Sequence, residues 1–231
     1  MDEKQPPREN PTPESRIDAL MPPEIALRCE AIGAAKAAKD ALSLKTLAVL
    51  AGAFIAFGAI FMTVTMTGGG SAPFGLMRVA GGVVFSLGLI LVVIGGAELF
   101  TGDNLMVMAW AGGRIRLRSL VRAWVIVYFG NLVGAVGTAV LVFLSGHYML
   151  GEGAVGKTAL AIATAKAQLP ILEAFFLGIL CNVLVCLAVW MSFGARSVVG
   201  KVAVIVPPIA AFVAAGFEHS IANMYFLPMG L

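Results

Sequence analysis

Charged side chains are scarce in this sequence. Only 13% of its 231 residues are Asp, Glu, Lys or Arg, whereas 59% are hydrophobic. An average soluble domain has about 25% charged and roughly 45–50% apolar residues. A chain of this size cannot keep so apolar a surface in water, which excludes a soluble globular enzyme and a disordered binding protein. We therefore expect most of the chain to lie in a lipid bilayer.

Several kinds of reactive site are also absent. No metal-ligand spacing, phosphate-binding loop or catalytic-triad pattern occurs in the sequence, so neither a metal nor another cofactor is expected. The three cysteines, Cys29, Cys181 and Cys186, fall at cytoplasmic or membrane positions and are predicted to be free thiols. The N-terminus lacks an apolar stretch that ends in a small-residue cleavage site, so no signal peptide is predicted.

The charges that are present gather near the N-terminus. Eight of the 13 acidic and seven of the 16 basic residues lie within residues 1–45. Residues 1–16 are polar and rich in proline, and we expect a disordered cytoplasmic tail there. In residues 17–45 apolar and charged side chains alternate, which predicts an amphipathic cytoplasmic helix region. Such a helix could pack on the end of a membrane bundle or act as a moving gate.

Uncharged runs fill the rest of the chain, and a spanning helix needs about 20 residues. Three runs have a suitable length: residues 46–66, 123–146 and 174–195. Two other regions are interrupted by polar residues: 79–97 continues as 104–113, and 202–217 continues as 220–231. Neither second piece can cross a bilayer alone, so each pair is predicted to be one crossing with a break near its middle. Residues 46–231 are thus predicted to be a transmembrane domain of five spans.

Basic residues indicate the orientation of these spans, because cytoplasmic loops carry an excess of Lys and Arg. With the N-terminus inside, 13 of the 16 basic residues lie on the cytoplasmic side. The three outside are Arg78, Lys157 and Lys166. The sequence therefore predicts a multi-pass protein of the cell (inner) membrane with a cytoplasmic N-terminus.

The two broken segments resemble each other. Gly-Ala-Glu at 96–98 recurs as Gly-Phe-Glu at 216–218, and Asp103 corresponds to Asn223, 120 residues later. Counting three crossings from one broken helix to the next, the two copies have opposite orientations in the membrane. Inverted repeats with discontinuous helices are a common plan of transport proteins. The predicted fold is an all-α membrane protein with two broken transmembrane helices.

Polar side chains at the breaks are candidates for function, because lipid cannot satisfy them. His219 titrates near neutral pH and can share a proton with a passing weak acid. Alternatively, a neutral imidazole satisfies the backbone groups that its own break frees. For Glu98 and Glu218 a structural role is the stronger expectation: each caps a half-helix or pairs with a nearby amide.

Five segments together resemble the formate/nitrite transporter family, and most of all its formate channels. They are GGAELFTGDN (95–104), YFGNLVGA (128–135), CNVLVCLAVWMS (181–192), AAGFEHSIANM (214–224) and PFGLMRVAGGVVFSLGLIL (73–91). The resemblance covers about residues 17–231. It implies an aquaporin-like inverted repeat of six spans and a homopentamer with one pore per protomer. Five spans are visible here, so the sixth span of the family is unaccounted for.

The same resemblance assigns site residues. The family's central histidine falls on His219 and the threonine of its first broken helix on Thr101, and their side chains are expected to hydrogen-bond across the pore. The other residues implied to line the pore are Leu99, Phe100, Asn182, Asn223 and Lys166, the last at an outer vestibule. The implied constrictions are Phe85, Leu89 and Phe212, although apolar residues of an apolar helix more often face lipid or core.

The expected function is transport of formate, or another small monovalent anion or weak acid, through this pore. His219 either lends a proton to the passing acid or, in an anion channel, only donates a hydrogen bond. The alternatives are a nitrite or hydrosulfide channel of the same family, a membrane-embedded enzyme that uses Glu218, His219 and Thr101, and a non-transporting fragment. The expected partners are the anion, the lipid bilayer and further copies of the chain, and nucleic acid is not expected.

Overall fold

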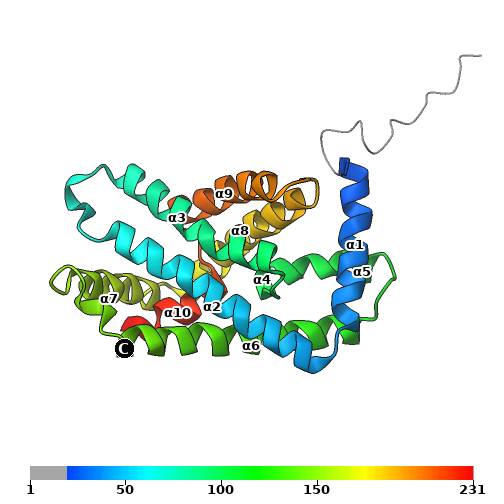
Figure 1. The fold of residues 1–231 in the computed structure, drawn as a ribbon, viewed down its shortest axis with the longest axis horizontal. Helices are drawn as coiled ribbons and strands as arrows, with labels where there is room; N and C mark the ends of the chain where they lie inside the picture. Colours follow the sequence, from blue (N-terminus) through cyan, green and yellow to red (C-terminus); the bar gives the residue numbers. More distant parts are fainter. Residues whose placement is uncertain (1–19, 231) are drawn as a thin grey trace, which may run out of the picture.

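The computed structural model describes residues 20–230, which form helices and no strand within that range (Figure 1). Five described helices are long and apolar enough to span a membrane: α2 (Ala41–Met66), α3 (Phe74–Gly95), α6 (Leu117–Leu144), α8 (Ile171–Ser192) and α9 (Val198–Ala215). The other α-helices are α1 (Pro22–Ala38), α4 (Phe100–Asp103), α5 (Val107–Ala111), α7 (Ala154–Ala167) and α10 (Ser220–Phe226). The 3₁₀ turns are η2 (Gly69–Ser71), η3 (Asn104–Met106), η4 (His147–Met149) and η5 (Pro228–Gly230). The expected tail at 1–16 lies outside the described residues.

Both predicted breaks are present, and each begins at a glycine. Gly96 caps the end of α3 and Gly216 caps the end of α9, and their φ angles of 73° and 80° lie in the left-handed region. Glycine adopts this conformation without the Cβ clash of other residues, so it ends a helix cleanly. The first break is shorter than predicted, because the chain is helical again at Phe100. Thr101 and Asp103 therefore lie on a helical turn and not in an irregular interruption.

The two broken units meet inside the bundle. Helix α2 packs against α3 and α6, α3 crosses α9, and α8 packs along α9. The short helices α4 and α10 contact each other, and both lie within the bundle (Figure 1). The breaks are held in equivalent ways: the backbone N–H of Glu98 donates to Leu47 O of α2, and that of Glu218 donates to Leu177 O of α8 (3.2 and 3.3 Å). These matching contacts confirm an inverted repeat with two broken helices.

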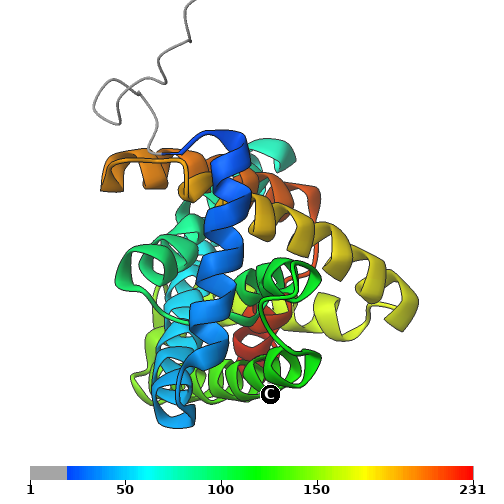
Figure 2. The same ribbon diagram turned by 90° about the vertical axis from the view of Figure 1, so that its right-hand side faces the viewer.

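Helices α1 and α7 mark opposite ends of the bundle, which we call the α1 end and the α7 end. Helix α1 lies across its end and packs against α5 and η3 (Figure 2). Its buried residues, Ile25, Cys29 and Gly33, repeat every four positions and form one face. The Cys29 thiol donates to Leu105 O (3.8 Å), and burial raises the pKa of Cys29 to about 11, so it stays a protonated thiol at neutral pH.

Candidate functional site

The predicted pair of Thr101 and His219 is in contact. The Thr101 hydroxyl oxygen lies 3.2 Å from His219 Nε2, and both side chains are buried. His219 is also the N-cap of α10, where its Nδ1 accepts the backbone N–H of Ala222 (3.1 Å). Because a backbone N–H can only donate, Nδ1 is the unprotonated nitrogen of a neutral ring. The proton of the neutral imidazole therefore lies on Nε2, and Nε2–H donates to Thr101.

Aromatic rings cover the histidine on its α7 side. The Phe212 ring stacks on the imidazole with centroids 5.7 Å apart, and Phe85 approaches edge-on at 6.3 Å. These three residues line a cavity of about 780 Å³ that belongs to the α7 end. Leu89 and Leu99 line a second cavity of about 280 Å³ at the α1 end. The apolar residues predicted as constrictions thus lie on the two sides of His219 and are buried.

A third cavity runs beside α8. It has a volume of about 740 Å³, and Phe100, Thr101, Asn182 and His219 are among the residues that line it. The Asn182 amide donates only a weak hydrogen bond to Cys186 Sγ (3.7 Å), and its buried carbonyl oxygen has no partner among the described residues. Asn182, whose amide is predicted to line the pore, therefore lies next to the Thr101–His219 pair, and its carbonyl oxygen can accept a further hydrogen bond.

At the α7 end, Glu218 joins two of the other predicted residues. Lys166 Nζ lies 2.7 Å from Glu218 Oε2, and the Asn223 amide donates to the same oxygen (2.8 Å). Lys166 also lies over the Phe226 ring, 5.4 Å from its centroid. The expected pairing of Glu218 with an amide is confirmed. Lys166 lines the cavity at the α7 end, and its charge is balanced there by Glu218.

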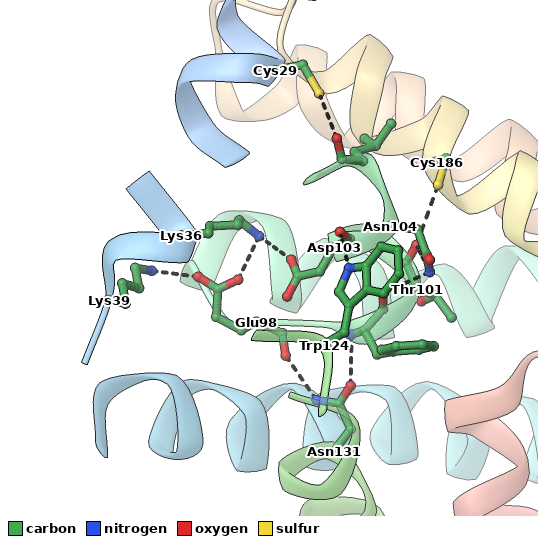
Figure 3. A network of polar contacts seen from close by, with 12 residues as sticks. Cys29, Lys36, Lys39, Glu98, Thr101, Asp103, Asn104, Trp124, Asn131 and Cys186 are labelled. Carbon is green, nitrogen blue, oxygen red and sulfur yellow. Dashed lines mark hydrogen bonds and ion pairs between the residues drawn. The ribbon is translucent and has the colours of Figure 1, made fainter. Parts of the chain in front are cut away.

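At the α1 end, Glu98 is bound by Lys36 of α1 and by Lys39, which directly follows that helix, as Figure 3 shows. Lys36 Nζ lies 2.7 Å from Glu98 and 2.5 Å from Asp103, and Lys39 Nζ lies 2.5 Å from Glu98. The prediction that Glu98 caps a half-helix or pairs with an amide is wrong: its carboxylate binds two ammonium groups. Burial alone lowers the pKa of Lys36, but the carboxylates of Asp103 and Glu98 outweigh burial and raise that pKa above its ordinary value.

Asn131 of α6 is a site residue that sequence reasoning did not single out. Its carbonyl oxygen accepts the backbone N–H of Phe100 (2.9 Å), and its amide donates to Glu98 O (2.9 Å) (Figure 3). The amide also donates to Ala48 O of α2 (2.8 Å). The side chain is fully buried. The bonds to Phe100 and Glu98 hold the first break, immediately before Thr101, and the bond to Ala48 ties α6 to α2. Its position within an otherwise apolar span was the available signal, because lipid cannot satisfy an amide.

The comparison with known families agrees with this geometry. A family model described as formate/nitrite transporter matches residues 23–231. The chain belongs to the formate/nitrite transporter family. It is 48% identical to the formate channel FocA of Escherichia coli (strain K12) over 215 residues, which are 93% of this chain and 75% of that protein. It is 39% identical to a probable formate transporter of Methanothermobacter thermautotrophicus over 226 residues, with 91% and 82% coverage.

A solved structure gives the same result. The chain resembles a pentameric formate channel with formate bound, with a TM-score of 0.79, 47% sequence identity, and coverage of 82% of this chain and 74% of that one. These relatives of the formate/nitrite transporter family are membrane channels and transporters, so the chain is a membrane protein and not an enzyme. Within residues 20–230 no group of three or more His, Cys, Asp or Glu side chains could hold a metal ion.

Proposed function

We propose that this chain conducts formate across the membrane through a path that passes His219. The observation that carries the proposal is the contact between Thr101 and His219 at the meeting point of the two breaks, with a cavity toward each end of the bundle. The names of the relatives, a formate channel at 48% identity and a formate-bound structure, support formate as the cargo.

In this proposal His219 and Thr101 replace the water that the anion loses. An anion that enters the apolar zone of Phe85, Phe212 and Leu89 meets a large desolvation cost unless it finds hydrogen-bond donors. The Thr101 hydroxyl accepts the Nε2–H of His219, so its own O–H is the donor available to the anion, and the unpartnered Asn182 oxygen can accept from a protonated acid. The residues proposed to line the path are Leu99, Phe100, Thr101, Asn182, His219, Asn223 and Lys166.

The geometry favours a histidine that donates a hydrogen bond over one that lends a proton. A charged imidazole carries a proton on both nitrogens. Its Nδ1–H would then point at the backbone N–H of Ala222, and the cap of α10 would be lost. The neutral ring keeps both of its hydrogen bonds, so we infer that formate passes His219 mainly as the anion.

The placement of the protein follows the charge of its loops. We infer an inner-membrane protein with a cytoplasmic α1 end, since 13 of the 16 basic residues then lie inside. We also infer a homopentamer, the assembly of the similar formate-bound channel. Large apolar side chains exposed along α6 and α8, such as Phe129, Leu141 and Phe175, are available for contact with lipid and with neighbouring copies.

The test is formate uptake into proteoliposomes by the wild type and the His219→Asn variant. Asparagine is a good N-cap and keeps one amide donor, but it does not titrate. We expect the variant to conduct within about tenfold of the wild type, with the same dependence on pH from 6 to 8. The matched control, His219→Leu, removes donor and cap together and should lower the flux by about tenfold to a hundredfold.

Two results would count against the proposal. Wild-type protein without formate flux in liposomes would remove the function itself. If instead His219→Asn conducts but loses the pH dependence of the wild type, proton lending by the imidazole becomes the better mechanism. Parallel uptake of nitrite and hydrosulfide ranks the possible cargoes.

A further inference from the structure

The cavity at the α7 end has more positive charge than its lysine–glutamate pair accounts for. Three basic residues line this cavity of about 780 Å³, namely Arg78, Lys157 and Lys166, together with one carboxylate, that of Glu218. Glu218 forms an ion pair with Lys166, whose Nζ lies 2.7 Å from Glu218 Oε2. Within residues 20–230, neither Arg78 nor Lys157 has a carboxylate within ion-pair distance. The cavity therefore keeps a positive surplus that comes from Arg78 and Lys157.

Arg78 is held in place by the broken helix. Its guanidinium donates from Nε to Ala214 O (3.4 Å) and from Nη2 to Val213 O. These carbonyls belong to the last turn of α9: Val213 O also accepts the backbone N–H of Gly216 (3.1 Å), whereas Ala214 O loses its helical partner because the N–H of Glu218 donates to Leu177 O. A cation at the C-terminal end of a helix is also favoured by the helix dipole. The side chain is therefore fixed at both ends, by α3 and by α9, and not free in solvent.

The fixed guanidinium has donors left over. Arginine carries five N–H groups, and the two bonds to α9 use two of them. Because Arg78 also lines the cavity, the remaining N–H groups are available to a ligand inside it. A guanidinium binds a carboxylate through two parallel hydrogen bonds, which a lysine ammonium cannot match. Val213 and Ala214 directly follow Phe212, whose ring covers His219, so such a ligand is held next to the apolar zone.

We propose that Arg78 is the anion-capture residue of the α7-end cavity, and that it selects small carboxylates there before they reach His219. Lys157 adds long-range attraction to the same cavity. Lys166, paired with Glu218, contributes little net charge. This inference rests on the proposed function, since it names the residue through which a transported carboxylate first binds.

The test measures formate uptake and formate binding in the wild type, Arg78→Gln and Arg78→Lys. For Arg78→Gln we expect the half-saturating formate concentration to rise about tenfold or more, as loss of a charge-assisted pair implies. Maximal flux should stay within about threefold, because the path at His219 is unchanged. Arg78→Lys keeps the positive charge but loses the two parallel N–H donors of the guanidinium. Formate uptake by this variant should therefore still depend on salt concentration, but its preference for formate over chloride should be lost.

Two controls separate this effect from general damage. Arg118→Gln removes one exposed positive charge from the start of α6, at the α1 end, and should leave half-saturation unchanged. Saturation-transfer NMR with formate as the probe reports binding without any flux. If Arg78→Gln fails to fold because the end of α9 loses its partner, the test uses Arg78→Lys instead. Its selectivity for formate over chloride, compared with that of the wild type, then shows whether Arg78 captures the anion.

The possible failures are distinguishable. If wild-type protein binds formate in the NMR experiment but carries no flux, the proposed transport is wrong and Arg78 can still be judged by binding. If the folded Arg78 variants bind and transport formate with wild-type half-saturation and wild-type selectivity against chloride, the capture role is wrong while transport stands.

Discussion

The Thr101 hydroxyl accepts the Nε2–H of His219 at a buried site. It takes the place of the water molecule that would accept this N–H in solution. Thr101→Val keeps the shape of the side chain but leaves that N–H without a partner, which costs about 1–3 kcal/mol. We expect formate flux to fall about tenfold and the melting temperature in detergent to drop. Thr101→Ser keeps the hydroxyl and should stay within about threefold of the wild type.

The matched control for this prediction is Thr46→Val. Its hydroxyl is exposed and bonds to Leu42 O of its own helix (3.0 Å), whereas the hydroxyl of Thr101 is buried and bonds to His219. That change should leave flux unaltered. A Thr101→Val protein that conducts formate like the wild type, at equal incorporation into liposomes, contradicts the role given to the hydroxyl.

At the same scale, the residues that sequence reasoning found and missed differ in one respect. His219, Thr101 and Glu218 are interrupters of apolar runs, so their chemistry stands out against their neighbours. The partners of Glu98 could not be found in this way, because Lys36 and Lys39 lie on α1 and at its end and meet it only when α1 folds across the end of the bundle. Pairing across 59 residues depends on tertiary structure, which local patterns do not contain.

At the scale of elements, α2 and α6 come unusually close, and glycine allows it. A Cβ at Gly134 would lie 1.9 Å from the backbone oxygen of Val49, whereas a Cβ at Gly137 would meet nothing within 4 Å. Gly134→Ala should therefore push the helices apart and destabilise the protein by about 1–3 kcal/mol. Gly137→Ala, in the same helix, should be neutral or stabilise by up to about 1 kcal/mol.

Thermal unfolding of the two alanine variants in one detergent measures this difference. Because Asn131 lies one turn before Gly134 on α6 and binds the first break, we also expect Gly134→Ala to lower formate flux. Equal melting temperatures for the two variants would contradict the close packing of α2 on α6.

The spans were predictable because bilayer thickness fixes their length, and a run of about 20 uncharged, mostly apolar residues is typical of a membrane-spanning helix. Helix α7 (Ala154–Ala167) was not predicted. With 14 residues and two lysines it is too short and too polar for a span, and it is held by contacts with η4 and η5. The position of each break within its span was approximate, because the turn at Gly96 takes few residues and helix α4 resumes at Phe100.

At the scale of the whole molecule, the two ends of the path carry different charge. At the α1 end, Lys36 and Lys39 balance Glu98 and Asp103, while the α7 end keeps a surplus of positive charge. The balance at the α1 end exists only while α1 stays docked. The same ion pairs therefore fix α1 to the segment that carries Thr101, and the docking of α1 and the geometry of the site depend on each other.

Lys36→Met tests this coupling. The change leaves two buried carboxylates with one remaining lysine, and breaking such a buried pair costs about 3–5 kcal/mol. The triple variant Lys36→Met, Glu98→Gln, Asp103→Asn removes the unpaired charges and should recover most of the loss. Arg114→Gln is the control, because it breaks the more exposed pair with Glu30, which is worth about 0–1 kcal/mol. Melting temperature and alkylation of Cys29, which lies on the buried face of α1, measure the outcome.

The stabilisation that Lys36 gains from Glu98 and Asp103 changes with pH in one direction. The folded pKa of Lys36 lies above its ordinary value of 10.5, so its stabilisation is complete below that value and is lost as pH rises through the folded pKa. The melting-temperature gap between wild type and Lys36→Met should thus be constant from about pH 8 to 10 and narrow above about pH 10.5. A gap that closes already at about pH 8 would show that Lys36 is not held between two carboxylates, and that α1 docks by its apolar face alone.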